Sequence, residues 1–130
     1  DAAFLCDLHA HLCDAEIIGL LGGRWDPAAR EMHVQAPFPC RAVARADDGA
    51  TDVEMDPVSE LQVREVIRAR DLDVVGWYHS HPRFVAEPSV TDIENQRSYQ
   101  ALFRDEGARG AEQQLDAAAA SATLMLEDRK

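Results

Sequence analysis

A strong helix start and a strong strand follow each other in the middle of the chain, and together they require a fold that mixes helices with strands. Asp56 and Pro57 are typical of the cap and the first residue of a helix, which apolar spacing extends to about Arg70. Asp73 to His79 is rich in β-branched and aromatic residues and predicts a central strand. We therefore expect an α/β or α+β sandwich.

The rest of the chain alternates between helical and extended patterns, without an internal repeat. Besides the central pair we expect, in chain order, a helix (3–13), strands (16–23, 31–36 and 40–46), a turn (47–49), a loop (82–88), a helix (89–104), an Ala-rich helix (107–121) and a short strand (122–126). Gly22 and Gly23 are interpreted as the end of the first strand, before a turn at 25–27. Pro37 and Pro39 should keep their stretch extended and unpaired.

Apolar spacing also predicts which residues of two helices face the core. These are Phe4, Leu5, Leu8 and Leu12 of the first helix and Leu61, Val63, Val66 and Ile67 of the second.

Length and charge limit what the chain can do. Its 130 residues suit one domain, and its apolar runs are far shorter than the roughly 20 residues of a membrane span. The formal net charge of −11 argues against direct nucleic-acid binding and weakly favours basic protein partners. Three cysteines without a CxxC pair exclude a complete disulfide framework and a thiolate zinc finger. A reducing, intracellular location, nuclear or cytoplasmic, is the simpler expectation.

Chemistry is concentrated around His79, His81 and Asp92. Two histidines one residue apart on an extended segment point to the same side, so both imidazoles can reach one metal ion. Asp92 lies in the first turn of the next expected helix, and the loop before it can fold this carboxylate back onto the ion. Two histidines and one carboxylate form a catalytic zinc set, because three protein ligands leave one position open for water.

A hydrolase built on this set also needs a base and a group that stabilises the oxyanion. Glu16 is the candidate general acid/base, because a carboxylate at the start of an apolar strand is costly unless it has a task. Ser89 is the candidate donor to the oxyanion. Each has a structural alternative: Glu16 could be an exposed residue at a strand start, and Ser89 with Asp92 is close to a helix capping box. His9 and His11 have the same spacing as the histidine pair but lie in an expected helix, so they are interpreted as ordinary helix residues.

The pattern Glu16, His79-Ser80-His81, Ser89 and Asp92 resembles the JAMM motif of the MPN-domain metalloproteases. Its flanks, 17–24, 54–59 and 75–78, are similar to the subgroup of the Myb-like, SWIRM and MPN domain histone deubiquitinase and its MPN-domain-containing relatives. The resemblance covers roughly residues 1–106. It implies an MPN (cytidine-deaminase-like) fold with a curved mixed β-sheet flanked by helices.

The same resemblance implies the activity and its residues. His79, His81 and Asp92 would bind one Zn²⁺, Glu16 would be the general acid/base, and Ser89 would support the oxyanion. The reaction would be hydrolysis of the isopeptide bond between ubiquitin and a lysine amine, on a ubiquitinated protein such as a histone or on a ubiquitin chain. Partner subunits are expected by the same resemblance, and a membrane partner is not.

Two alternatives remain open from the sequence: a catalytically silent MPN scaffold, and a reader of modified DNA, against which the net charge argues. The family pattern also changes after the third helix. From about residue 107 the chain is polar and Ala-rich, so the expected single domain over 1–130 is divergent or truncated in its C-terminal part.

Overall fold

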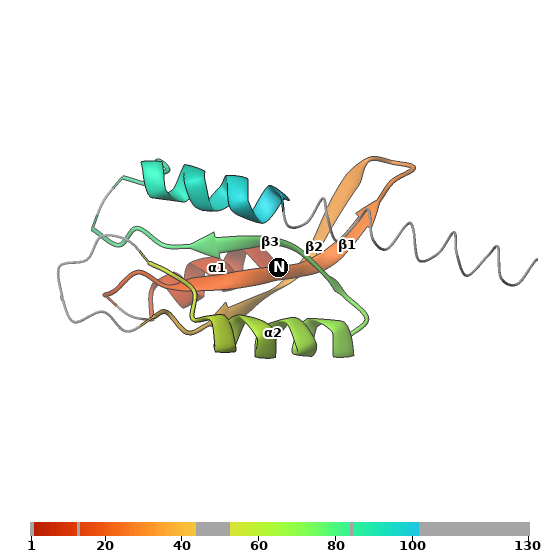
Figure 1. Ribbon diagram of the computed structural model, residues 1–130, viewed down its shortest axis with the longest axis horizontal. Coiled ribbons are helices and arrows are strands. Elements are labelled where there is room, and N and C mark those ends of the chain that lie inside the picture. The colour runs from red at the N-terminus through yellow and green to blue at the C-terminus, as the bar shows by residue number, and fades with distance from the viewer. Residues whose placement is uncertain (1, 13, 44–52, 84, 102–130) are drawn as a thin grey trace, which may run out of the picture. The chain divides into compact units, whose positions relative to one another are not determined.

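A computed structural model describes residues 2–12, 14–43, 53–83 and 85–101. The chain divides into two compact units, Asp1–Ala86 and Glu87–Lys130. The first unit contains, in chain order, α1 (Ala2–Ala10), β1 (Ile18–Asp26), β2 (Glu31–Cys40), α2 (Pro57–Ala69) and β3 (Asp73–His79) (Figure 1). The expected mixture of helices and strands is confirmed.

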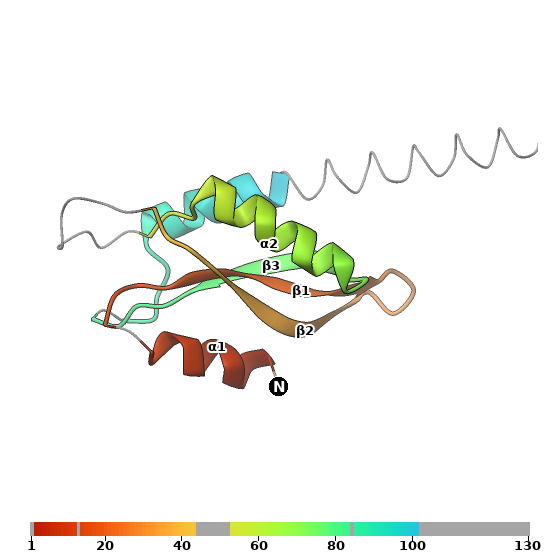
Figure 2. The same ribbon diagram turned by 90° about the horizontal axis from the view of Figure 1, so that it is seen from below.

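The strands of the first unit form a three-stranded antiparallel sheet in the order β2-β1-β3. The helices α1 and α2 lie on opposite faces of this sheet (Figure 2). The bounds predicted for β3 are confirmed, but its central position is wrong within the described strands, since β1 lies between the other two. The order places the start of β1 beside the end of β3, where Ile18 pairs with His79.

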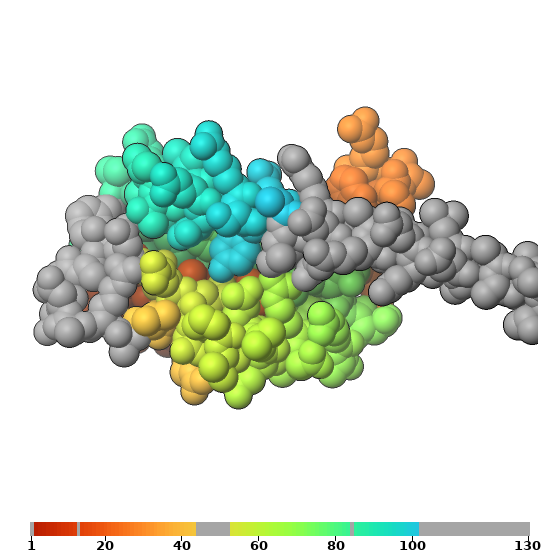
Figure 3. Space-filling model, in the orientation of Figure 1, coloured from red at the N-terminus to blue at the C-terminus, as the bar shows by residue number. Residues whose placement is uncertain are grey.

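The core lies between the sheet and α2. Its buried residues come from β1, β2, α2 and the segments that flank the helix: Ile18, Leu20, Phe38, Met55, Ile67 and Leu72. In the space-filling view α2 covers much of the strands behind it, while the end of the β1–β2 hairpin stands clear (Figure 3). Leu20 and Ile67 are fully buried, so β1 and α2 meet at the centre of this core.

The predicted start of α2 is confirmed. The side chain of Asp56 accepts a hydrogen bond from the backbone N–H of Ser59 at 2.7 Å, and Pro57 begins the helix. The predicted apolar face is only half right, because Leu61 and Val66 are 67% and 46% exposed. Helical spacing identifies the apolar side chains that lie along one side of the helix. The orientation of the helix on the sheet decides which of these side chains are buried.

The strand β1 does not end at its glycine pair, so this prediction is wrong. It continues to Asp26, and its register against both neighbours shifts around Gly22. A side chain at Gly22 would meet the Phe38 ring at 2.5 Å, and one at Gly23 would collide with the backbone oxygen of His33. The glycines therefore allow close approach within a bulged strand rather than a turn, and the turn itself occupies residues 27–30.

The two strands predicted at 31–36 and 40–46 are instead one continuous strand, β2, through Pro37 and Pro39. Both prolines are paired, with Leu21 and Gly19 of β1. The two prolines lie two residues apart, so their backbone nitrogens point to the same side of β2. A strand at the edge of a sheet tolerates proline where this side has no neighbouring strand. Beyond β2, residue 42 forms an isolated bridge with Met55, and residues 44–46 lie outside the described part.

The first helix is confirmed but is shorter than predicted, and its predicted core face is wrong. Phe4, Leu5, Leu8 and Leu12 are 64%, 42%, 47% and 72% exposed. The helix turns another face to the sheet, and the Nδ1 atom of His9 hydrogen-bonds the Tyr78 hydroxyl at 2.9 Å.

In the second unit, residues 90–101 are helical, as predicted for this part of the third helix. The rest of that predicted helix (102–104), the Ala-rich helix, the last strand and the turn at 47–49 fall outside the described residues. Among the described helices, none has the length and apolar character needed to cross a membrane.

Candidate active site

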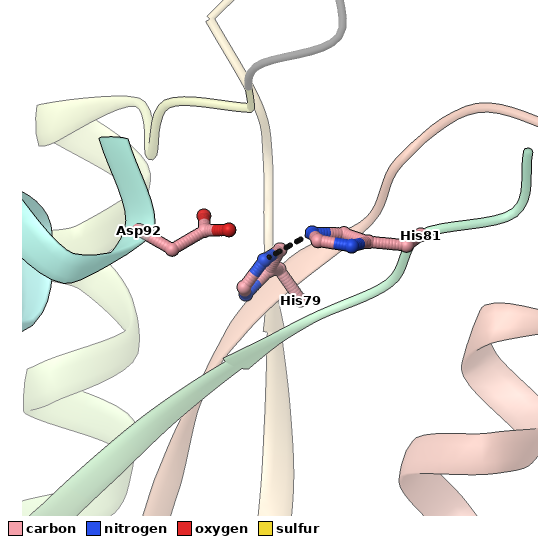
Figure 4. Close-up of side chains that lie close together, drawn as sticks. All are labelled: His79, His81 and Asp92. Carbon is pink, nitrogen blue, oxygen red and sulfur yellow. Dashed lines mark hydrogen bonds between the residues drawn. The ribbon is translucent and has the colours of Figure 1, made fainter. Parts of the chain in front are cut away.

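The end of β3 brings two imidazoles together. The Nε2 atoms of His79 and His81 lie 2.9 Å apart, and the ring centroids are separated by 4.8 Å (Figure 4). Two nitrogens that bind one tetrahedral ion at about 2.05 Å lie about 3.3 Å from each other. The pair is therefore arranged almost as two ligands of a single ion would be.

Neighbouring groups hold both rings. The Nδ1–H of His81 donates to the backbone oxygen of Val85 at 2.9 Å. Because a carbonyl oxygen can only accept, Nδ1 carries the proton and Nε2 of the neutral ring keeps the lone pair that a metal needs. The ring of His79 stacks on Trp77, with centroids 4.9 Å apart and planes 12° from parallel. This arrangement is chemically suited to a divalent ion.

Glu16 lies two residues before the start of β1. Ile18 pairs with His79, and the Ser80 N–H donates to the Ile17 oxygen at 3.1 Å, which extends the same register by one residue. Glu16 is the neighbour of Ile17, which makes two hydrogen bonds to Ser80, so its backbone lies close to the segment that carries the histidine pair. The Oε1 atom of Glu16 is shielded from solvent.

A pocket of about 690 Å³ opens beside the two histidines. Its lining comes from α1 and the turn after it, the start of β1, and the end of β3 with its loop: Cys6, Asp7, Ala10, His11, Asp14, Ile17, Tyr78, His79, Ser80, His81, Pro82 and Ala86. Burial raises the pKa of the Tyr78 phenol well above its ordinary value, so Tyr78 stays protonated at neutral pH. The pocket therefore lies on the α1 face of the sheet with Tyr78, whereas the ring of His79 stacks on Trp77, which packs against the core.

In the second unit, Ser89 and Asp92 cap the helix at 90–101. The Ser89 N–H donates to Oδ2 of Asp92 at 2.7 Å, and the Asp92 N–H donates to Oγ of Ser89 at 3.1 Å. This reciprocal pair is the capping box that the sequence offered as the structural alternative. Metal binding by Asp92 and oxyanion binding by Ser89 stay predictions, and both are compatible with the cap. Asp92 appears in Figure 4 at the start of this helix.

Trp77 and Tyr78 are neighbours on β3 and have different surroundings. Trp77 packs against the core and stacks on His79, whereas Tyr78 lines the pocket. Strand alternation could have indicated this, since Trp77 lies two residues before His79. His9 and His11, interpreted as ordinary helix residues, bond separately to Tyr78 and to the backbone oxygen of Asp7. The bond from His81 to Val85 depends on the loop path, which no sequence pattern indicates.

The fold and the histidine pair agree with one protein family. Residues 5–104 match the model of the JAB1/Mov34/MPN/PAD-1 ubiquitin protease family, and the chain belongs to this family. The resemblance drawn from the motif is thereby confirmed.

Its relatives fall within the expected subgroup. Deubiquitinase MYSM1 of Homo sapiens is 43% identical over 109 residues, which are 84% of this chain and 13% of that protein. Histone H2A deubiquitinase MYSM1 of Branchiostoma floridae is 45% identical over 104 residues, 78% of this chain and 12% of that protein. An MPN domain-containing protein of Homo sapiens is 42% identical over 97 residues, 75% of this chain and 19% of that protein. The chain therefore spans only a small part of the relatives' length.

Proposed function

We propose that the chain is the catalytic domain of a zinc-dependent deubiquitinase. It would hydrolyse the isopeptide bond between ubiquitin and a lysine side chain, on a protein such as a histone or within a ubiquitin chain. The observation that carries this proposal is the pair of Nε2 atoms of His79 and His81, which lie 2.9 Å apart at the end of β3. The substrate class rests on similarity to proteins named deubiquitinase and histone H2A deubiquitinase.

His79, His81 and Asp92 are the proposed ligands of one Zn²⁺, each offering one ligand atom. Asp92 belongs to the second unit, so its approach to the histidine pair is itself part of the proposal. Oδ2 of Asp92 accepts the Ser89 N–H, and coordination through Oδ1 would leave this capping bond in place. When bound, the ion would act as a Lewis acid on the scissile carbonyl and lower the pKa of water.

The chain's own residues would carry the proton and the charge. Glu16 would remove a proton from the water that attacks the carbonyl carbon, and the Ser89 hydroxyl would donate a hydrogen bond to the resulting oxyanion. Glu16 would then deliver its proton to the lysine nitrogen as the carbon–nitrogen bond breaks. The second proton of the water leaves the new carboxyl group and is taken up by the released amine, so the products are a ubiquitin carboxylate and a lysine ammonium, and every atom of the added water is accounted for.

The same proposal treats residues 1–130 as one MPN domain with a divergent or truncated C-terminal part. It places the protein in the nucleus or cytoplasm, where ubiquitinated proteins and partner subunits would be available.

The test compares zinc content with cleavage of di-ubiquitin, with and without a chelator. Glu16→Gln should retain zinc and lose about 10²–10⁴-fold in kcat, because only the acid/base is removed. His81→Ala and Asp92→Ala should lose zinc as well as turnover. His33→Ala is a matched control, since His33 lies on β2 with its side chain 58% exposed.

Three results would contradict the proposal. Zinc retained in both ligand variants would overturn the metal assignment, and normal cleavage by Glu16→Gln would assign the base elsewhere. A wild-type chain without zinc and without turnover, but able to bind ubiquitin, would indicate a silent scaffold.

A further inference from the structure

Ser80, which lies between the two histidines, makes two bonds to a single residue of β1. Its backbone N–H donates to the oxygen of Ile17 at 3.1 Å, and its Oγ accepts the N–H of Ile17 at 3.0 Å. In a regular antiparallel pair the second of these bonds would go to a backbone carbonyl. Here a side chain takes that place, so this contact between β1 and β3 depends on the residue type at position 80.

The contact lies at the point where the regular sheet ends. The paired part of β1 begins at Ile18, so Glu16 and Ile17 precede it. Ile17 is only 8% exposed, and loss of its acceptor would leave a buried N–H without a hydrogen bond. The hydroxyl therefore fixes the backbone one residue after Glu16.

We infer that Ser80 is a positioning residue: its hydroxyl holds Ile17 and thereby fixes the backbone from which the neighbouring Glu16 carboxylate extends. The inference rests on the proposed function for the catalytic task of Glu16, but the contact itself does not. A general base must lie within hydrogen-bond distance of the proton that it removes, so a small displacement of the backbone is costly.

Three variants of the 130-residue chain distinguish the effect of the Ser80 hydroxyl from the effect of side-chain volume. Ser80→Ala removes the hydroxyl, Ser80→Thr keeps it, and Ser80→Val has the shape of threonine without it. Backbone amide exchange of Ile17, followed by NMR, reads the contact without any need for activity. Zinc content and the kcat and KM of ubiquitin cleavage then report on the site.

We expect the Ile17 amide of the Ala and Val variants to exchange at least about tenfold faster than in wild type, and Thr to restore its protection. In the same two variants kcat should fall about 10- to 100-fold, with KM and zinc content close to wild type. A residue that only stabilised the fold would change the exchange of the whole core and would lower the amount of folded protein, not kcat alone.

The inference is overturned if Ser80→Ala keeps the Ile17 protection, if Val behaves like Thr, or if the loss of turnover follows a loss of zinc. If the wild-type chain does not cleave ubiquitin at all, the proposed function fails. The amide exchange of the three variants then still decides whether the Ser80 hydroxyl holds Ile17.

Discussion

Ser89 and Asp92 combine an observed structural role in a helix cap with a proposed role in the reaction. Their reciprocal hydrogen bonds cap the helix at 90–101. In this cap Oγ of Ser89 and Oδ2 of Asp92 each accept one backbone N–H. A capping bond is worth about 1 kcal/mol, whereas an oxyanion donor contributes about 2.7–4 kcal/mol to the transition state. These magnitudes differ enough for the two roles to be separated by substitution.

We expect Ser89→Gly and Ser89→Ala to lose turnover equally but stability unequally. Both remove the hydroxyl, and kcat should fall about 10²–10³-fold in each. Glycine is an acceptable N-cap and alanine is not, so only the Ala variant should lose about 1 kcal/mol of helix stability. The measurements are kcat for ubiquitin cleavage and denaturant unfolding. Near-normal kcat in the Gly variant would mean that Ser89 is a cap alone.

Among the elements, β1 departs most from its prediction. A glycine pair normally indicates the end of a strand, yet β1 passes through Gly22 and Gly23 because the Phe38 ring and the His33 backbone lie against them. Phe38 belongs to the core cluster, so the glycines make room for a core side chain of the neighbouring strand.

Gly22→Ala should therefore destabilise the chain by about 1–3 kcal/mol, since the new methyl group would overlap the Phe38 ring. Gly76→Ala is the matched control: it is also in a strand, but its nearest contact is the flexible end of Leu21 at 3.3 Å, so we expect a smaller loss. Chemical denaturation of both variants measures the difference. Equal losses would show that close packing on Phe38 is not the reason for glycine at this position.

At the scale of the whole molecule, the ion of the proposed function would take its ligands from residues of both compact units. His79 and His81 belong to the first, and Asp92 belongs to the second. An ion that binds only the folded state raises the free energy of unfolding of the structure that holds its coordinating residues. The increase grows with the logarithm of the ratio of ion concentration to dissociation constant. Zinc should therefore couple the two units.

Zinc added to the metal-free chain should raise the Tm and slow amide exchange in residues 90–101 as well as around the histidine pair. In Asp92→Ala any remaining protection should stay within the first unit, and in His81→Ala zinc should have no effect on either. The measurement is hydrogen exchange with and without zinc, with His33→Ala as control. Protection of residues 90–101 in Asp92→Ala would show that the carboxylate does not join the units.

The amino-acid sequence by itself determined the local features. Asp56 and Pro57 start α2, Asp73–His79 forms β3, and the spacing of Ser89 and Asp92 caps a helix, because each depends on residues close together in the chain. The spacing of His79 and His81 likewise sets them on one side of an extended segment.

Only the tertiary structure decided what depends on contacts between distant segments. It turned the predicted apolar face of α1 outward, carried β1 through its glycines, and bound Ser80 to Ile17, 63 residues away. Hydrophobic spacing indicates which side chains lie on the same face of a helix or strand. The stability that this face contributes depends on the segment that packs against it. The segment that packs against a face is set by the path of the whole chain, and so is the register that pairs Ile18 with His79.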